Sequence, residues 1–193
     1  GRYSIIGLSP DAIWKAQGDK PSLNLNAEHD PSAFEACDQG TLDALRDFIE
    51  GAHIDLPEDL PPMSAGVFGY MGYDAVRLME HLPNENPDAL GLPDGLFVRP
   101  TMIAVFDSVK DEVILVTPVR PHEGTTAKMG YEKALDRLER TITRFDQALP
   151  HAEPEMDVAA LPAPTSNTPK ETYFDMVARA KEYIAAGDIF QAV

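Results

Sequence analysis

Short runs of β-forming residues alternate with turn-forming residues at the start of the chain. The runs cover residues 2–8, 12–17 and 23–27. Ser9-Pro10-Asp11 separates the first two runs, and residues 18–21, which include a glycine and a proline, separate the second from the third. Because proline, glycine and aspartate favour turns, this pattern predicts three short strands in an antiparallel meander.

Helical spacing of apolar residues marks four later segments. Residues 41–49 predict an amphipathic helix with Thr41 as its N-cap, and residues 75–82 predict one or two further helical turns. The longest predicted helix covers residues 128–149, and the last covers residues 170–186, directly before a glycine that suits a helix end. The expected buried stripe of the longest helix consists of Tyr131, Leu135, Leu138, Ile142 and Phe145.

The remaining pattern sets the expected domain organisation. Residues 97–106 and 113–119 are apolar runs around a polar turn, which predicts a β-hairpin. We expect an α+β domain over residues 1–149, with an antiparallel sheet and flanking helices, and a proline-rich linker over residues 150–169. Residues 170–193 then open a second domain with a helix and a strand that starts at Ile189. Since both ends of the sequence fall within predicted strands, we expect the chain to be part of a longer protein.

Composition and charge exclude several classes of protein. The 193 residues are 44% hydrophobic and 25% charged, as in globular domains, and the net charge of −16 argues against a nucleic-acid partner. Cys37 is the single cysteine, so a disulfide framework is excluded and a reducing, cytoplasmic location is expected. The apolar runs are too short to cross a membrane, and the first residues do not resemble a signal peptide.

Common catalytic motifs are missing from the sequence. It contains no phosphate-binding glycine loop, zinc-protease, nucleophile-elbow or EF-hand pattern. Each histidine stands alone among loop residues and is expected to be solvated rather than catalytic; the five are His29, His53, His81, His122 and His151. Acidic residues that could be imagined as metal ligands are more simply solvated turn carboxylates; they are Asp55, Glu58, Asp59, Asp107 and Asp111.

Two stretches suggest more specialised roles. In residues 66–72 a glycine occurs at every third position of a strand-like run, which indicates close packing against this backbone, a sharp bend or a seat for a ligand. Gln191 is the only polar residue in the run 189–193. Its amide is expected either to form hydrogen bonds at a sheet edge or to face a ligand.

These stretches belong to a wider resemblance that extends along the whole chain. In order, residues 1–7, 62–74, 92–94, 105–107 and 180–191 resemble the component I, or large-subunit, family of anthranilate synthases. The resemblance implies that residues 1–149 form the amino-terminal α+β domain of that family. It also implies that the helix and strand of residues 170–193 open the chorismate-binding domain.

The resemblance implies a reaction, a cofactor and partners. Members of that family are lyases of tryptophan biosynthesis that use Mg²⁺ and ammonia to convert chorismate to anthranilate and pyruvate. A glutaminase partner, component II, supplies the ammonia from glutamine, and tryptophan is the feedback inhibitor. The Mg²⁺ ligands are expected downstream of Val193, so this segment is expected to hold no metal and to be inactive alone.

The resemblance also assigns candidate site residues. Gln191 matches an active-site position that is a lysine in isochorismate synthases, and because an amide cannot activate water as a base, it implies an enzyme that uses ammonia. Arg2, Tyr3 and Ser4 follow the position of the family's feedback element, which places them near a tryptophan pocket; edge-strand packing is the alternative role.

Other functions stay open at this point. Aminodeoxychorismate synthase component I, of the folate pathway, also has the matching glutamine, although residues 69–74 and 188–191 resemble anthranilate synthase more closely. A stand-alone amino-acid-binding regulatory module and a structural protein with an acidic interaction surface are the alternatives from other classes.

Overall fold

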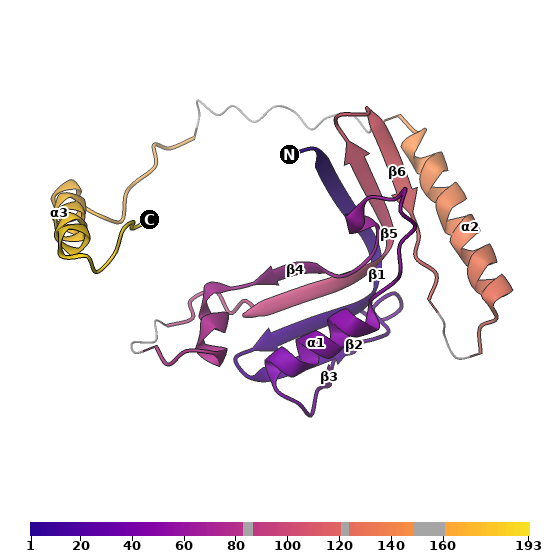
Figure 1. The fold of residues 1–193 in the computed structure, drawn as a ribbon, viewed down its shortest axis with the longest axis horizontal. Coiled ribbons are helices and arrows are strands. Elements are labelled where there is room, and N and C mark those ends of the chain that lie inside the picture. Colours follow the sequence, from indigo (N-terminus) through magenta and orange to yellow (C-terminus); the bar gives the residue numbers. More distant parts are fainter. Residues whose placement is uncertain (83–86, 121–123, 149–160) are drawn as a thin grey trace. The chain divides into compact units, whose positions relative to one another are not determined.

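The computed structural model describes residues 1–82, 87–120, 124–148 and 161–193. The chain divides into two compact units, Gly1–Gln147 and Ala148–Val193. In the first unit the described strands form one antiparallel sheet in the order β3-β2-β1-β5-β4, with β6 paired to β5 (Figure 1). The strands are β1 (Tyr3–Gln17), β2 (Lys20–Asn24), β3 (Glu35–Ala36), β4 (Phe68–Met71), β5 (Gly95–Asp107) and β6 (Glu112–Val116).

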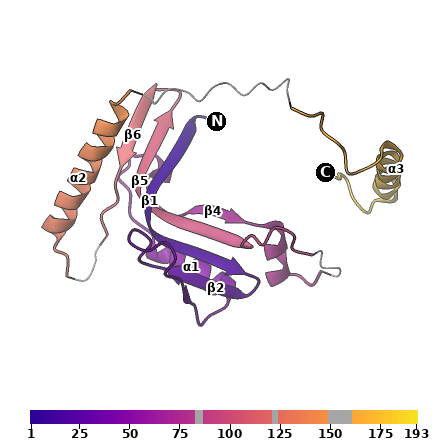
Figure 2. The same ribbon diagram turned by 180° about the vertical axis from the view of Figure 1, so that it is seen from behind.

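A long ribbon made of β1 and β5 is the centre of this sheet. The two strands pair from Tyr3 opposite Asp107 to Ala16 opposite Gly95, with an irregularity between Pro10 and Ala12. There the ribbon bends, as Figures 1 and 2 show. β4 pairs with the first part of β5 and β6 with its last part. The strand on the other side of β5 is therefore β4 at one end of the ribbon and β6 at the other end.

The prediction of two separate strands before residue 18 is wrong. Residues 3–8 and 12–17 lie in one strand, whose register shifts between Pro10 and Ala12, and Ser9, with φ of 49°, lies inside that strand and not in a turn. The physical reason is that one long partner, β5, continues opposite both halves and keeps β1 extended across the irregularity. A real turn follows at Gly18, where φ is 55°, and leads into β2.

Helix α1 (Thr41–Gly51) packs against the ribbon and forms the core with it. Ala12, Trp14 and Ala16 alternate along β1 and are at most 2% exposed, and they cluster with Phe48 of α1. Thr41 is not the N-cap that the sequence predicted: Gly40 occupies that position. Asp19, from the turn before β2, replaces a local cap, because its Oδ1 accepts the Thr41 N–H at 2.7 Å.

The hairpin predicted around residue 110 is confirmed by β5 and β6, which pair from Ile103 opposite Val116 to Asp107 opposite Glu112. From Met102 to Val105 each residue is at most 1% exposed, so both faces of β5 are covered here. Short 3-10 helices flank β4: η1 (Pro62–Ser64) and η2 (Tyr73–Leu78). The second covers residues 75–78 of the helical turns predicted over residues 75–82, and residues 79–82 are not helical.

Helix α2 (Ala127–Phe145) lies beside β6 (Figure 1) but presents a different face than predicted. Ala134 is buried, whereas four members of the predicted stripe are 43–64% exposed; these are Tyr131, Leu135, Ile142 and Phe145. The inward face instead carries Gly130, where a Cβ would lie 3.0 Å from Val119 Cγ1, and Arg137, which hydrogen-bonds Thr117. The orientation of α2 therefore depends on the close approach at Gly130 and on the hydrogen bonds of Arg137, and not on hydrophobic burial alone.

The second unit contains α3 (Lys170–Ala186), whose bounds are those predicted. Gly187 ends it in the left-handed conformation, with φ of 85°. Residues 161–169 contain neither helix nor strand, and residues 149–160 of the predicted linker lie outside the described residues. The strand predicted from Ile189 is wrong, since residues 189–193 form none. A strand requires a hydrogen-bonded neighbour, and the described part of this unit offers no second strand.

Candidate functional site

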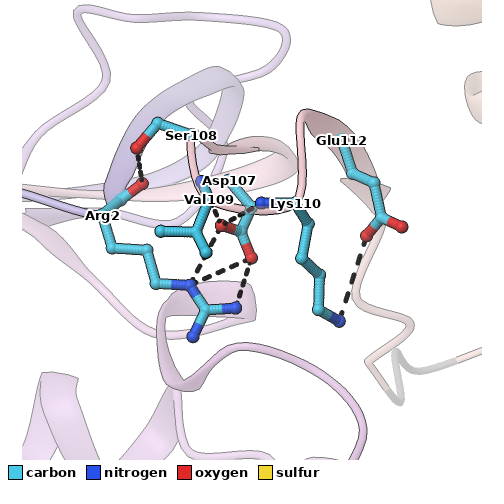
Figure 3. A network of polar contacts seen from close by, with 6 residues as sticks. All are labelled: Arg2, Asp107, Ser108, Val109, Lys110 and Glu112. Carbon is cyan, nitrogen blue, oxygen red and sulfur yellow. Dashed lines mark hydrogen bonds and ion pairs between the residues drawn. The ribbon is translucent and has the colours of Figure 1, made fainter.

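The start of β1 is anchored to the end of β5 by a network of polar contacts (Figure 3). Arg2 Nε donates to both oxygens of Asp107 at 3.0 and 3.1 Å, and Nη2 donates to Oδ2 at 2.6 Å. The backbone N–H groups of Val109 and Lys110 also donate to Asp107, at 3.0 and 3.2 Å. Ser108 donates to the Arg2 carbonyl through both its backbone N–H and its hydroxyl. The network closes the sheet at this end.

The carboxylate at the centre of this network is buried. The Asp107 side chain is only 2% exposed, while that of Arg2 is 44% exposed. The Arg2 guanidinium holds the pKa of Asp107 well below its ordinary value, and the two backbone N–H donors lower it further, against the opposing effect of burial. The expectation that Asp107 is a solvated turn carboxylate is therefore wrong. The strand register brings Arg2 to it, which no local sequence pattern indicated.

The three residues expected near a tryptophan pocket lie together at this end of β1. The Arg2 guanidinium carbon is 4.8 Å from the centre of the Tyr3 ring, within cation–π range. Tyr3 and Ser4 are opposite Asp107 and Phe106 of β5. Among the described residues, β1 has no strand on its other side here, because β2 pairs only with Ile13–Gln17. Arg2 is thus a fixed, half-exposed cation at a sheet edge.

Gln191, the candidate active-site residue, lies in the second unit. It follows α3 and the left-handed Gly187, in an exposed segment without regular structure. The sequence predicted no partner residue for Gln191 in the first unit.

The glycine-rich run of residues 66–72 is part of the sheet. A Cβ at Gly69 would lie 1.9 Å from the Leu96 carbonyl oxygen and 2.7 Å from Phe97 Cα, so β4 can approach β5 here only because position 69 has no side chain. Gly66 has φ of 119°, a conformation that other residues rarely adopt. Of the roles considered for this run, close backbone packing is the one that the contacts support.

The candidate metal ligands do not come together among the described residues. In the described ranges, no three His, Cys, Asp or Glu side chains converge as a metal site would require. His53 lies 3.2 Å from Asp55 in an exposed position, and His122 and His151 are outside the described residues. No helix among them is long and apolar enough to cross a membrane.

A pocket of about 350 Å³ in the first unit was missed by sequence reasoning. Four cationic residues contribute to its lining: Arg99 of β5, Arg120 after β6, and Lys133 and Arg137 of α2. These residues are far apart in sequence and no motif spacing connects them. Only the folded arrangement of β5, β6 and α2 reveals the cluster.

Comparison with known proteins gives a consistent result. The family of chorismate-binding enzymes matches residues 4–193. Anthranilate synthase component 1 of Cereibacter sphaeroides is 44% identical over 193 residues, which is all of this chain and 39% of that protein. Anthranilate synthase component 1 of Thermus thermophilus is 39% identical and is matched over 37% of its length. The chain thus spans about two fifths of the length of these curated relatives.

The fold is also that of a solved structure. The crystal structure of anthranilate synthase component I from Streptococcus pneumoniae matches with a TM-score of 0.63 at 19% identity, over 97% of this chain and 39% of that chain. The α+β class, with an antiparallel sheet and flanking helices, is confirmed. With a family match over nearly its entire length, the chain belongs to the family of chorismate-binding enzymes.

Proposed function

We propose that this chain is part of component I of an anthranilate synthase, a lyase that converts chorismate and ammonia to anthranilate and pyruvate. The observation that carries this proposal is the 44% identity to a component 1 protein along all 193 residues, without a part of the chain left unmatched.

The two compact units suit two different roles in such an enzyme. Residues 1–149 would be the amino-terminal domain, residues 150–169 a linker and residues 170–193 the start of the chorismate-binding domain. The relatives are much longer than this chain, so the remaining catalytic groups and the Mg²⁺ ligands would lie in sequence beyond Val193. This segment alone would then be inactive.

Gln191 is proposed as an active-site residue of the intact enzyme. Its amide can donate and accept hydrogen bonds but cannot take a proton from water at neutral pH, which suits ammonia as the nucleophile.

Arg2, Tyr3 and Ser4 are proposed to border a tryptophan feedback site. An amino-acid inhibitor carries a carboxylate, and a guanidinium that is held in place loses little freedom when it binds one. Arg2 has this property, because Asp107 fixes its Nε and Nη2 while 44% of its side chain stays exposed.

The experiment that tests the proposal measures nitrogen-donor use by the complete protein. With chorismate and Mg²⁺, ammonium should give fluorescent anthranilate without any partner, whereas glutamine should do so only when a glutaminase component II is added. Fluorescence from neither donor, with the protein shown to be folded by circular dichroism, would contradict the proposal.

A further inference from the structure

The pocket between β5, the segment after β6 and α2 has an unusual charge for this protein. The chain has a net charge of −16 and only 16 Lys and Arg residues, and four of these line this one pocket. Two carboxylates, Asp11 and Glu28, also line it. Counting only Lys, Arg, Asp and Glu, the lining is therefore positive within an otherwise acidic chain, and a cleft lined by one sign of charge concentrates ions of the other sign.

Most of this positive charge is not neutralised by neighbours. Arg99 is paired with Asp11, its Nε donating at 2.7 Å. In the described part of the chain, no ion pair involves Arg120, Lys133 or Arg137. When the negative charge of Glu28 is subtracted from the positive charges of these three side chains, the net charge is still positive.

The hydrogen bonds of the two unpaired arginines go to neutral acceptors. Arg137 Nη1 donates to the Thr117 hydroxyl at 2.9 Å and, more weakly, to the Thr101 carbonyl at 3.4 Å. Arg120 Nη2 donates to the Ala52 carbonyl at 3.4 Å. Such acceptors hold the guanidinium groups in place without cancelling their charge. The arginines are therefore pre-positioned and still able to attract an anion.

Arg120 also carries a donor without a partner. Its Nε is buried and has no hydrogen-bond acceptor among the described residues. Burial lowers the pKa of Arg120 and repulsion from Arg99 lowers it further, while Asp11 has the opposite, smaller effect; arginine stays protonated at neutral pH. A bound oxyanion would offset this repulsion.

The amino-terminal end of α2 borders the same pocket. Thr125 and Gly130, on either side of the first turn of this 19-residue helix, both contribute to the lining. The partial positive charge at a helix start adds to the field of the side chains.

From this arrangement we propose that the pocket binds a small dianionic oxyanion, either a phosphate monoester or a dicarboxylate, through Arg120, Lys133 and Arg137. The volume of about 350 Å³ is at the lower end of the range for small-molecule sites, which suits a metabolite rather than a nucleic acid or a peptide. The site lies entirely within the first unit, and the inference does not depend on the proposed reaction.

A purely structural role for the same residues is the competing explanation. In that case the arginines only form hydrogen bonds that hold α1 and α2 against the sheet, and added anions stabilise the protein no more than chloride does. The two explanations differ most clearly at Lys133, whose side chain is exposed and makes none of the hydrogen bonds or ion pairs among the described residues. Removing its charge should change anion binding without changing the fold.

The test is isothermal titration calorimetry of the complete protein with inorganic phosphate and with malonate, at an ionic strength held constant with sodium chloride. We expect saturable binding of at least one probe, and the tighter one identifies the ligand class. Loss of a charge-assisted contact should raise Kd about tenfold in Arg120→Gln, and by about fivefold in Lys133→Gln because Lys133 is more exposed.

The matched control is Lys128→Gln, which removes one positive charge from the same helix at a side chain that is 84% exposed and outside the lining. It should change Kd by less than about twofold, because it alters net charge without altering the pocket. No saturable binding of either probe, or equal weakening by Lys128→Gln and Lys133→Gln, would overturn the proposal. If Arg120→Gln does not fold, Lys133→Gln still decides the question.

Discussion

The protonation of Asp107 should couple the stability of the first unit to pH. Its pKa in the folded chain is lowered mainly by Arg2, so the ionised form is favoured by folding. Such a group adds stability above its ordinary pKa, near 3.8, and that stability is lost as the pH falls through and below this value. The wild type should therefore lose more stability on acidification than Asp107→Asn, which cannot ionise.

Thermal melting between about pH 7 and about pH 3 measures this directly. The Tm difference between the wild type and Asp107→Asn should be largest near neutral pH and should shrink below about pH 5. A difference that does not vary with pH would mean that Arg2 does not favour the ionised form of Asp107.

Replacement of Arg2 should affect regulation before catalysis. In the complete enzyme, Arg2→Ala is expected to raise the tryptophan concentration for half-inhibition by about tenfold, the loss expected for one charge-assisted contact, while ammonia-dependent turnover is kept. Because Arg2→Ala also leaves the buried Asp107 carboxylate without its partner, Arg2→Ala/Asp107→Asn is the matched control. Unchanged inhibition in both variants would place the feedback site elsewhere.

At the residue scale, the sequence could predict residue types but not their partners. It singled out both Arg2 and Asp107, yet for unrelated reasons, as a feedback residue and as a solvated carboxylate. They are 105 positions apart, and only the register of β1 against β5 joins them. The pocket arginines were missed for the same reason, since a cluster built by tertiary structure leaves no spacing pattern.

Among the elements, β4 depends on the absence of a side chain at Gly69. Gly69→Ala should destabilise the protein by about 1–3 kcal/mol, the usual cost of overpacking, because its Cβ would meet the backbone of β5 rather than a movable side chain. Gly51→Ala, at the end of α1 with open space around it, is the control and should be neutral or stabilising by up to about 1 kcal/mol. Urea unfolding of the two variants would measure both; equal effects would contradict the close approach of β4 and β5.

Docking of α1 should depend on Phe48 far more than on its neighbour. Phe48 is 5% exposed and packs with Trp14, whereas Ile49 is 47% exposed. Phe48→Ala should therefore cost about 3–5 kcal/mol of unfolding free energy, and Ile49→Ala less than about 1 kcal/mol. Similar losses in denaturant unfolding would show that α1 uses another face.

At the element scale, periodicity predicted which helices exist better than which faces they bury. The bounds of α3 and the β5–β6 hairpin follow from local pattern and turn chemistry. In α2, however, the apolar stripe lies beside the contacting face, because Gly130 permits a close approach and Arg137 bonds to Thr117 and Thr101. The absence of a strand after Ile189 has a similar origin: β-forming residues need a neighbouring strand before they form one.

For the whole molecule, the resemblance of residues 1–7 and 62–74 to component I indicated a family that the comparisons establish over residues 4–193. Motif reasoning without that resemblance indicated no reaction, because the sequence contains none of the common catalytic motifs. The glycine-rich run has a structural role instead, since Gly69 is required by the spacing of two strands.

The most direct test of the proposed function is the identity of the product that the complete protein forms from chorismate, ammonium and Mg²⁺, determined by mass spectrometry together with a pyruvate assay. We expect anthranilate and pyruvate in equal amounts. An aminated chorismate that keeps its enolpyruvyl group, with no pyruvate released, would contradict it and assign the chain to an aminodeoxychorismate synthase.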